Sequence, residues 1–592
     1  MVRPARTYAR DARQRIEPIV TIDQTGFFQH GPELRDEWED DLALRHYLAR
    51  ALPSEVHDEI APSLAEMGHM AANELLDLAL EMDRREHEPR LVRFDAWGRR
   101  VDRIEVSPIW DRIGAVAHEK GVIATGYERA HQEWSRVHQF ALAYLYSPSS
   151  ALYSCPLAMT DGAAKTLLTH GDQELIDRAV PRLTSRDPDA AWTSGQWMTE
   201  RTGGSDVGIS ETEATKDGSV WRLHGTKWFT SAITADMALT LARPEGNPSG
   251  GRGLAMFYVE VYDDAGSLND IRVLRLKDKL GTRQMPTAEL ALEGTTAHLV
   301  GGPSDGTRNI TPMLAITRLW NAVSAASGMR RTTALARDYA TKRVAFGRRL
   351  IDQPLHQTTL AWMQAATDAT LQLTFRAVEL LGREEAGEAR DEERLALRML
   401  LPIAKLVTAK DAVAVASEGL EAFGGAGYIE DTHLPVLLRD AQVLPIWEGT
   451  TNVLSLDALR ALQREDALAP YVTEIVSTAK QAQHADLAPI AERAVDAAQH
   501  AASWVANAID DPGIDAVQHG ARRWAFTLGR AHQAALLVAQ AQADLDESRG
   551  GRGVAVAQRF ARQPFDLLEP AGSLGDVDAT LAADGRRDQA ED

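Results

Sequence analysis

The chain of 592 residues carries 85 acidic and 64 basic side chains, which gives a formal net charge of −21. This length predicts several domains with large buried cores and excludes a small disulfide-stabilised module. The single cysteine, Cys155, cannot form an intramolecular disulfide or a cysteine-based zinc site, so we expect a cytoplasmic protein without a metal centre. No apolar run approaches the roughly 18 residues that cross a bilayer, so no membrane partner is expected. The negative charge also disfavours long-range attraction of the whole chain to nucleic acid.

The first half of the chain changes its hydrophobic periodicity twice. Residues 1–39 hold several arginines without the apolar stretch of a secretory signal, so we expect an exposed arm. Apolar residues at three- and four-residue spacing predict a helical domain over residues 40–190. Short β-branched and aromatic runs between turn residues then predict an antiparallel β domain over residues 191–305.

Helical periodicity returns in the second half. Residues 306–463 hold four long helical stretches, the last from Leu437 to Leu462, and predict a helix bundle. Residues 464–570 are again helical and alanine-rich, which predicts an additional helical domain. Residues 571–592 read as an acidic, disordered tail. The order of segments predicts an α+β multidomain protein.

The first candidate site lies in the β domain, where residues 198–206 read Met-Thr-Glu-Arg-Thr-Gly-Gly-Ser-Asp. Gly203 and Gly204 let the backbone approach a ligand closely and present successive N–H groups to a phosphate. Thr199 and Ser205 add hydroxyl donors. Ordinary turn chemistry explains the same composition equally well when the segment is taken alone.

An aromatic strand follows at residues 225–231, which read Gly-Thr-Lys-Trp-Phe-Thr-Ser. A ring such as Trp228 can stack on a planar ligand while a hydroxyl such as Thr230 bonds to the edge of that ligand. Half-buried aromatic residues are nevertheless more often part of a core.

Two further segments belong to the predicted bundle. Arg343–Arg349 closes its first helix with cations, which the helix dipole favours, and Phe423–Tyr428 is a glycine-dense link between two helices. Gly424 and Gly425 permit either close backbone approach or a tight turn. A charged helix end and a tight turn account for both segments without any ligand.

The fifth segment, residues 446–452, reads Ile-Trp-Glu-Gly-Thr-Thr-Asn. Glu448 sits between a bulky aromatic residue and a glycine, a partly buried setting that suits a general base. Taken alone, a glutamate here is more typical of the start of a helix, where a negative charge is favourable.

In this order and spacing, the five segments together resemble the acyl-CoA dehydrogenase flavoprotein family. That family carries Thr-Glu-x-x-Gly-Gly-Ser-Asp, Lys-x-(Trp/Phe)-(Ile/Phe)-Thr, Arg-x-x-Phe-Gly, Gly-Gly-x-Gly-(Tyr/Phe) and (Tyr/Trp)-Glu-Gly-Thr segments in the same order. Residues 93–102, 275–283 and 353–355, together with Trp447, further resemble the AidB-like adaptive alkylation-response branch. The resemblance implies an N-terminal helical domain, a middle β-barrel and a C-terminal four-helix bundle, followed by an extra helical unit.

The resemblance also implies an FAD bound between the β domain and the bundle of a homotetramer, a dimer of dimers. Some contacts would come from within the subunit and others from its neighbour. The implied cofactor-binding residues within the subunit are Met198, Thr199, Gly204, Ser205, Trp228, Thr230, Thr450 and Asn452. Those implied to reach the cofactor of a neighbouring subunit are Arg343, Phe346, Gly424 and Gly425.

By the same resemblance, Glu448 would be the catalytic base that removes the α-proton of an acyl-CoA thioester while a hydride passes from the β-carbon to the flavin. Some family members place the base on the first bundle helix, where this chain has Thr317, so Glu448 is the remaining candidate. Arg318 would help to position the substrate. An electron-transfer flavoprotein would accept the electrons.

An alternative function is binding of double-stranded DNA during alkylation stress, with weak or vestigial dehydrogenase activity. Residues 522–562 hold seven arginines against three acidic side chains, a local charge of +4 in an acidic chain. Such a stripe can bind phosphates, but runs of charge are as often simply solvated. The candidate DNA-contacting residues are Arg522, Arg523, Arg530, Arg559 and Arg562.

Overall fold

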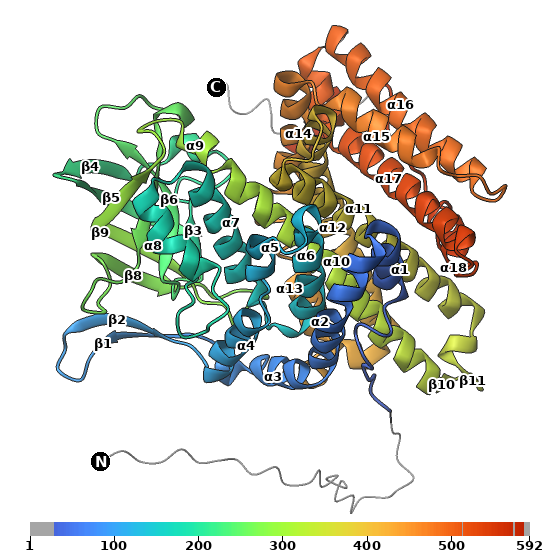
Figure 1. Ribbon diagram of the computed structural model, residues 1–592, viewed down its shortest axis with the longest axis horizontal. Coiled ribbons are helices and arrows are strands. Elements are labelled where there is room, and N and C mark those ends of the chain that lie inside the picture. Colours follow the sequence, from blue (N-terminus) through green and yellow to red (C-terminus); the bar gives the residue numbers. More distant parts are fainter. Residues whose placement is uncertain (1–28, 512, 572–574, 585–592) are drawn as a thin grey trace, which may run out of the picture.

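The computed structural model describes residues 29–511, 513–571 and 575–584. A β domain lies at one side of a large helical body, and the C-terminal helices lie at the other side (Figure 1). Residues 1–28 and 585–592, which hold most of the predicted arm and the end of the predicted tail, lie outside the described residues. In the part of the chain that is described, no helix is both long and apolar enough to cross a membrane.

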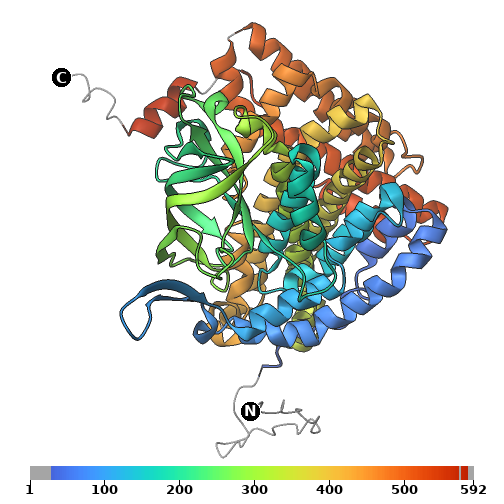
Figure 2. The same cartoon turned by 60° about the vertical axis from the view of Figure 1, so that its left-hand side comes forward.

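The N-terminal domain is helical as predicted, but a β-hairpin interrupts it. The hairpin joins β1 (Arg90–Phe94) to β2 (Arg100–Glu105) and extends from the body below the β domain (Figures 1 and 2). Its turn forms because the Asp95 carboxylate accepts hydrogen bonds from the N–H groups of Trp97 and Arg99. The helices are α1 (Leu42–Ala51), α2 (Ser54–Ala72), α3 (Glu74–Met82), α4 (Pro108–Glu119), α5 (Ala124–Glu128), α6 (Ser135–Tyr146), α7 (Ser154–His170) and α8 (Gln173–Leu183).

The β domain closes on itself as a barrel. Neighbouring strands pair in the order β3-β6-β4-β5-β9-β7, β8 pairs with β9, and a pairing of β6 with β7 closes the ring. The prediction of an antiparallel unit is wrong for two pairings, because β6 runs parallel to both β3 and β4. Alternation of apolar and polar residues sets the face of a strand, not its direction. The strands are β3 (Ser194–Trp197), β4 (Glu213–Asp217), β5 (Val220–Ser231), β6 (Met237–Pro244), β7 (Ala255–Glu260), β8 (Ile271–Leu276) and β9 (Thr287–Val300).

The bundle domain packs three long helices and one shorter helix around a shared apolar core. The continuous helix predicted from Leu437 to Leu462 is wrong. Glu448 and Gly449 adopt left-handed backbone angles, with φ of +56° and +103°, which no right-handed helix contains. The bundle elements are α9 (Gly306–Asn309), α10 (Thr311–Lys342), β10 (Val344–Ala345), β11 (Arg348–Arg349), α11 (Pro354–Ala386), α12 (Asp391–Ala422), α13 (Pro435–Ala441) and α14 (Thr451–Glu465).

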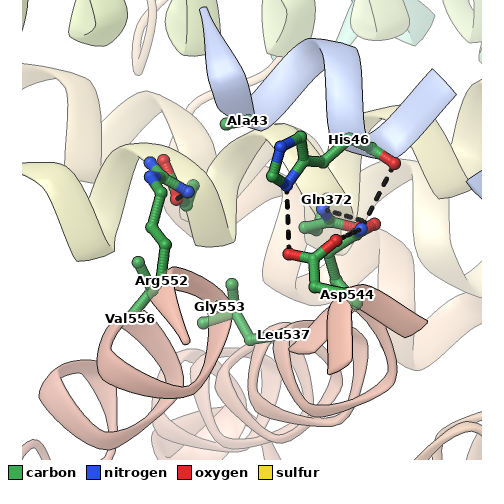
Figure 3. A pocket seen from close by; sticks show the side chains of 10 residues that line it. Ala43, His46, Gln372, Leu537, Asp544, Arg552, Gly553 and Val556 are labelled. Atoms are coloured by element: carbon green, nitrogen blue, oxygen red, sulfur yellow. Dashed lines mark hydrogen bonds and ion pairs between the residues drawn. The ribbon is translucent and has the colours of Figure 1, made fainter. Parts of the chain in front are cut away.

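The additional helices are joined to the rest of the protein through one continuous core. They are α15 (Leu468–Ala479), α16 (Ala488–Asp510), α17 (Ile514–Asp546) and α18 (Arg552–Phe560). The helix α17 packs against α11, α12, α14 and α1. Polar contacts reinforce this packing. His46 on α1 lies 3.2 Å from the Asp544 carboxylate on α17 (Figure 3). Arg552 on α18 lies 2.8 Å from Asp368 on α11.

Part of the predicted disordered tail is a helix, α19 (Gly575–Ala583). Alanine and leucine, which favour helices, make up much of its sequence. The acidic composition therefore does not prevent a short ordered segment here.

Candidate functional site

The glycine-rich loop and the aromatic strand of the β domain are joined by a buried ion pair. Lys227 on β5 is fully buried, and its Nζ lies 2.7 Å from Oε1 of Glu200 in the loop. The Trp228 N–H donates to the Thr199 carbonyl at 3.0 Å. Burial alone would raise the pKa of Glu200, but the Lys227 ammonium and a hydrogen bond from the Thr212 hydroxyl hold that pKa below its usual value. Two motifs that are separate in sequence therefore form one unit.

The shape of this loop depends on its glycines. Gly203 has a φ of +129°, which side chains rarely allow. A Cβ on Gly204 would lie 2.6 Å from the Thr199 hydroxyl, so the two residues pack without room for a side chain. Ser205 is exposed, whereas Met198 is partly buried against the apolar cluster beside the barrel. The loop thus presents small, polar groups at the surface of the β domain.

The aromatic strand is also fixed in place. The Lys277 Nζ lies 3.8 Å from the centre of the Trp228 ring, a cation–π distance, and 2.5 Å from the Glu289 carboxylate. The Thr230 hydroxyl donates to the Ala288 carbonyl at 2.7 Å, so its hydrogen is used within the sheet while its oxygen can still accept. Trp228 therefore has a cation on one face of its ring.

Glu448 lies in the loop between α13 and α14, where one group from its own bundle and one from the barrel reach its carboxylate. The Thr317 hydroxyl on α10 lies 2.8 Å from Oε2, and Gln196 Nε2 on β3 lies 3.4 Å from the same oxygen. No side chain of the described residues donates to Oε1. The side chain is half-buried. The fold thus brings the candidate base to the junction of the barrel and the bundle, with one oxygen held and one available.

A buried lysine lies beside this loop. Lys405 on α12 has no exposed surface, and its Nζ donates to the carbonyl oxygens of Trp447 and Gly449, each at 2.7 Å. Burial lowers the pKa of Lys405 to about 7, against the attraction of the Glu448 carboxylate. The backbone is therefore held on both sides of Glu448.

Three buried polar atoms around this junction have no hydrogen-bond partner among the described residues: Gln196 Oε1, Trp447 Nε1 and Asn321 Oδ1. Asn321 belongs to the same region, because its Nδ2 donates to the Leu444 carbonyl at 3.2 Å. Buried polar atoms in proteins nearly always have a partner. A cluster of unpaired donors and acceptors fits the site of a ligand that offers both kinds of group.

Other predicted residues line the same bundle end. Arg318 forms an ion pair with Asp457 on α14 at 2.6 Å, so its charge is already matched within the protein. Thr450 and Asn452 are exposed at the start of α14. The roles expected for these three residues toward substrate and cofactor stay predictions.

The residues expected to serve a neighbouring subunit lie far from Glu448 of their own chain. Arg343 is at the opposite end of α10 from Thr317, roughly 40 Å away at about 1.5 Å per residue. Phe346, at the tip of the β10–β11 hairpin, is fully exposed and has a φ of +52°. A Cβ added to Gly424 or Gly425 would meet nothing within 4 Å. This surface can act on a cofactor only if another chain brings one to it.

The candidate DNA-contacting arginines are less available than their sequence positions suggest. Arg523 pairs with Glu569 at 3.5 Å, Arg530 donates to the Pro564 carbonyl at 3.1 Å, and Arg559 donates to the Thr358 carbonyl at 3.4 Å. Of the five, Arg522 and Arg562 are exposed. The local charge of the sequence is therefore partly matched by acceptors of the protein itself.

Gln196 and Lys405 belong to the site but were not among the predicted residues. Lys405 had a signal in the sequence, since it is a single cation within the apolar run Leu-Pro-Ile-Ala-Lys-Leu-Val of a bundle helix. Such a lysine points toward the core and needs a polar partner there. Nothing in the sequence identifies Gln196 as a site residue, because single glutamines are common on strands.

Comparison with known families matches three consecutive parts of the chain. Residues 31–190 match the adaptive response protein AidB N-terminal domain, residues 195–295 the acyl-CoA dehydrogenase middle domain, and residues 304–463 the acyl-CoA dehydrogenase C-terminal domain. The matched boundaries follow the domain order of the structure.

Individual relatives agree with this assignment. The chain is 49% identical over 451 residues to acyl-CoA dehydrogenase family member 11 of Caenorhabditis elegans, covering 74% of this chain and 73% of the relative. It is 34% identical over 396 residues to the putative acyl-CoA dehydrogenase AidB of Escherichia coli, covering 65% and 71%. The crystal structure of Caenorhabditis elegans ACDH-11 in complex with C11-CoA superposes with a TM-score of 0.90 at 43% identity, covering 95% of this chain and 98% of the other. The chain therefore belongs to the acyl-CoA dehydrogenase family, in the branch that carries the AidB-type N-terminal domain.

Proposed function

We propose that the protein is an FAD-dependent acyl-CoA dehydrogenase that forms a double bond between C2 and C3 of an acyl-CoA thioester. Family membership identifies the class of enzyme as an oxidoreductase. The observation that carries the proposal for this chain is the Glu448 carboxylate, held at Oε2 by Thr317 and Gln196. A carboxylate that is fixed at one oxygen and open at the other suits the removal of a proton from a bound substrate.

The residues at the junction of the barrel and the bundle fit an FAD. The loop with Gly204 and Ser205 would hold its phosphates, and Trp228 with the Thr199 backbone would hold its ring system. The unpaired polar atoms of Gln196, Trp447 and Asn321 are further evidence for a polar ligand. A bound flavin supplies the two-electron acceptor for the hydride that leaves C3.

Glu448 takes the proton from C2 in this proposal. The Thr317 hydroxyl has one hydrogen, and its shortest contact is to Glu448 Oε2, so it stabilises the ionised carboxylate that must accept the proton. As the C2–H bond breaks, negative charge develops on the thioester oxygen and needs a donor. The Glu448 N–H donates to no carbonyl among the described residues and can serve that oxygen.

The substrate class is an acyl-CoA, since the nematode relative was crystallised with C11-CoA. The exposed Phe346 and the open Gly424–Gly425 turn suggest a homotetramer in which one subunit completes the cofactor site of another. A monomer mass by light scattering at micromolar concentration would contradict that assembly. An electron-transfer flavoprotein as acceptor and a location in the cytoplasm are parts of the same proposal.

Anaerobic mixing with a panel of acyl-CoAs tests the enzyme function directly. We expect at least one saturated acyl-CoA to bleach the flavin absorbance of the purified yellow protein. Mass spectrometry should then find the acyl-CoA two hydrogens lighter. A protein fully loaded with FAD that no thioester bleaches would lack the proposed activity.

Thr317→Val should slow the bleaching about tenfold without unfolding the protein. The substitution keeps the shape of the side chain but removes a hydrogen bond to a charged group, which is worth roughly 1.5–3 kcal/mol. The measurement is the rate of anaerobic bleaching at saturating acyl-CoA. Thr332→Val is the matched control, because the Thr332 hydroxyl is buried on the same helix but bonds only to the Gly328 carbonyl of that helix. Equal rates for both variants would mean that Thr317 does not assist the base.

Binding to double-stranded DNA should be weak and not steeply dependent on salt. Strong binding to DNA phosphates needs several exposed cations close together. Of the five candidate arginines, Arg522 and Arg562 are exposed, whereas the other three bond to acceptors within the protein. A gel-shift titration at 50 and 200 mM salt measures this. Tight binding at low salt that Arg522→Ala and Arg562→Ala together abolish would favour the alternative function.

A further inference from the structure

The loop that carries Glu448 has an unusual backbone for its residue type. Glu448 has a φ of +56°, in the left-handed region that glycine adopts most readily. A residue other than glycine stays in that region only when its surroundings impose it. The sequence cannot relieve the strain by placing glycine here, because the site requires a carboxylate. Another group must therefore hold the loop.

Lys405 is placed to hold it. Its Nζ donates to the carbonyl before Glu448 and to the carbonyl after it, each at 2.7 Å. The two carbonyls belong to Trp447 and Gly449, so Lys405 holds both ends of the Glu448–Gly449 segment and thereby restricts the φ of Glu448 and the direction of its side chain. The helix α12 that carries Lys405 packs against both α10 and α14, so the anchor is rigid.

The charge of Lys405 is also matched to this site. The charged groups that act on it are the Glu448 carboxylate and the Arg318 guanidinium. Arg318 is neutralised by Asp457, which also pairs with Arg398 at 3.0 Å. The carboxylate of Glu448 is therefore the group that compensates the buried ammonium.

From these contacts we propose that Lys405 is the positioning residue of the catalytic base: it fixes the backbone on both sides of Glu448 and so directs the carboxylate. This inference rests on the proposed dehydrogenase function. It assigns a task to a side chain that does not touch the substrate. A plain structural lysine would cap the same carbonyls without influencing proton transfer, and this difference can be measured.

Lys405→Met removes the charge and both hydrogen bonds. We expect anaerobic bleaching by the best acyl-CoA to slow about 100-fold, the loss that follows a misplacement of about 1 Å at a reacting group. We also expect the acyl-CoA concentration that gives half of the maximal bleaching rate to stay that of the wild type, because Lys405 does not touch the substrate. Lys410→Met, on the same helix and only half-buried, is the matched control and should match the wild type in both readouts.

The outcomes separate the two proposals. A wild-type protein that no acyl-CoA bleaches overturns the dehydrogenase function. A wild type that is bleached, together with a Lys405→Met variant that binds FAD and is bleached at the wild-type rate, overturns only the role of Lys405. If the methionine variant loses its fold, Lys405→Gln gives the same comparison, since it removes the charge but keeps one donor. A wild-type bleaching rate in that variant overturns the proposal.

A melting experiment tests the coupling without any activity. Glu448→Gln removes the group that compensates Lys405, whose pKa is about 7 in the folded protein. Below that pH the lysine is charged, so removing the Glu448 carboxylate lowers the stability of the protein. Above it the lysine is neutral, so the same change lowers the stability only slightly. The melting temperature of Glu448→Gln should therefore fall further below that of the wild type at pH 6 than at pH 8.5. An equal difference at both pH values would show that the two groups are not coupled and would overturn the proposal.

Discussion

Replacing Glu448 by Gln should abolish the bleaching of the flavin by acyl-CoA while the protein stays folded and yellow. Glutamine has the same size, and its carbonyl oxygen can still accept from Thr317 and Gln196, which bond to Oε2 in the native site. An amide cannot take up the C2 proton. The loss of a general base typically costs up to about 10⁴-fold in rate. The measurement is the anaerobic bleaching rate, with the ratio of flavin to protein absorbance as the test of FAD binding.

Two further variants sharpen this result. Glu448→Asp keeps the charge but withdraws the carboxylate by one methylene, so we expect an intermediate loss of about 100-fold. Glu492→Gln, exposed on α16, makes the same chemical change away from the site and should leave the rate unchanged. A Glu448→Gln variant that is bleached at the wild-type rate would exclude this carboxylate as the base.

Lys227→Met should produce the largest loss of stability. Lys227 and Glu200 are both buried, and Lys227 also donates to the Leu241 carbonyl at 2.7 Å. Removing the lysine leaves a buried carboxylate without its partner, which costs about 3–5 kcal/mol. The change also detaches the glycine-rich loop from β5, so FAD content should fall with stability. Urea unfolding followed by circular dichroism measures the first effect, and flavin absorbance measures the second.

The matched control is Lys216→Met, an exposed lysine on the neighbouring strand β4. Exposed substitutions of this kind change stability by about 0.5 kcal/mol or less.

The stability contributed by the Lys227–Glu200 pair should depend on pH. In the folded protein the pKa of Glu200 lies below its ordinary value. The stabilising contribution of Glu200 is therefore present above the ordinary pKa and is lost as the pH falls through the lowered pKa. The stability gap between wild type and Lys227→Met should therefore narrow in acid. A gap that is small at neutral pH would mean that the pair does not anchor the loop.

Much of this architecture follows from the sequence because it is encoded locally. The change from helical to strand periodicity near Trp192 and back near Pro312 marks the barrel, which the structure places between Ser194 and Val300. Side-chain periods of 3.6 and 2 residues are properties of short segments and do not need the rest of the chain. The same applies to the glycine-rich segments, whose composition alone predicts close backbone approach.

The missed features depend on contacts between distant segments. The hairpin β1–β2 projects from a helical domain and is anchored where Arg100 donates to the Val273 carbonyl of the barrel at 3.0 Å. The break in the helix predicted over 437–462 arises at Glu448, where a good helix former takes a left-handed conformation. Local propensity is a weak prior that tertiary contacts override. Here the overriding contacts come from Lys405.

The sequence by itself therefore determined the order of the domains, the family resemblance and the identity of Glu448 as the candidate base. The tertiary structure decided how that base is held, since Gln196, Thr317 and Lys405 come from three separate elements. It also decided that the arginines of the C-terminal helices are largely engaged by the protein, which the net charge of a segment cannot reveal. The physical reason is common to both cases: a charge acts through the atoms that lie within a few ångströms of it, and only folding brings those atoms together.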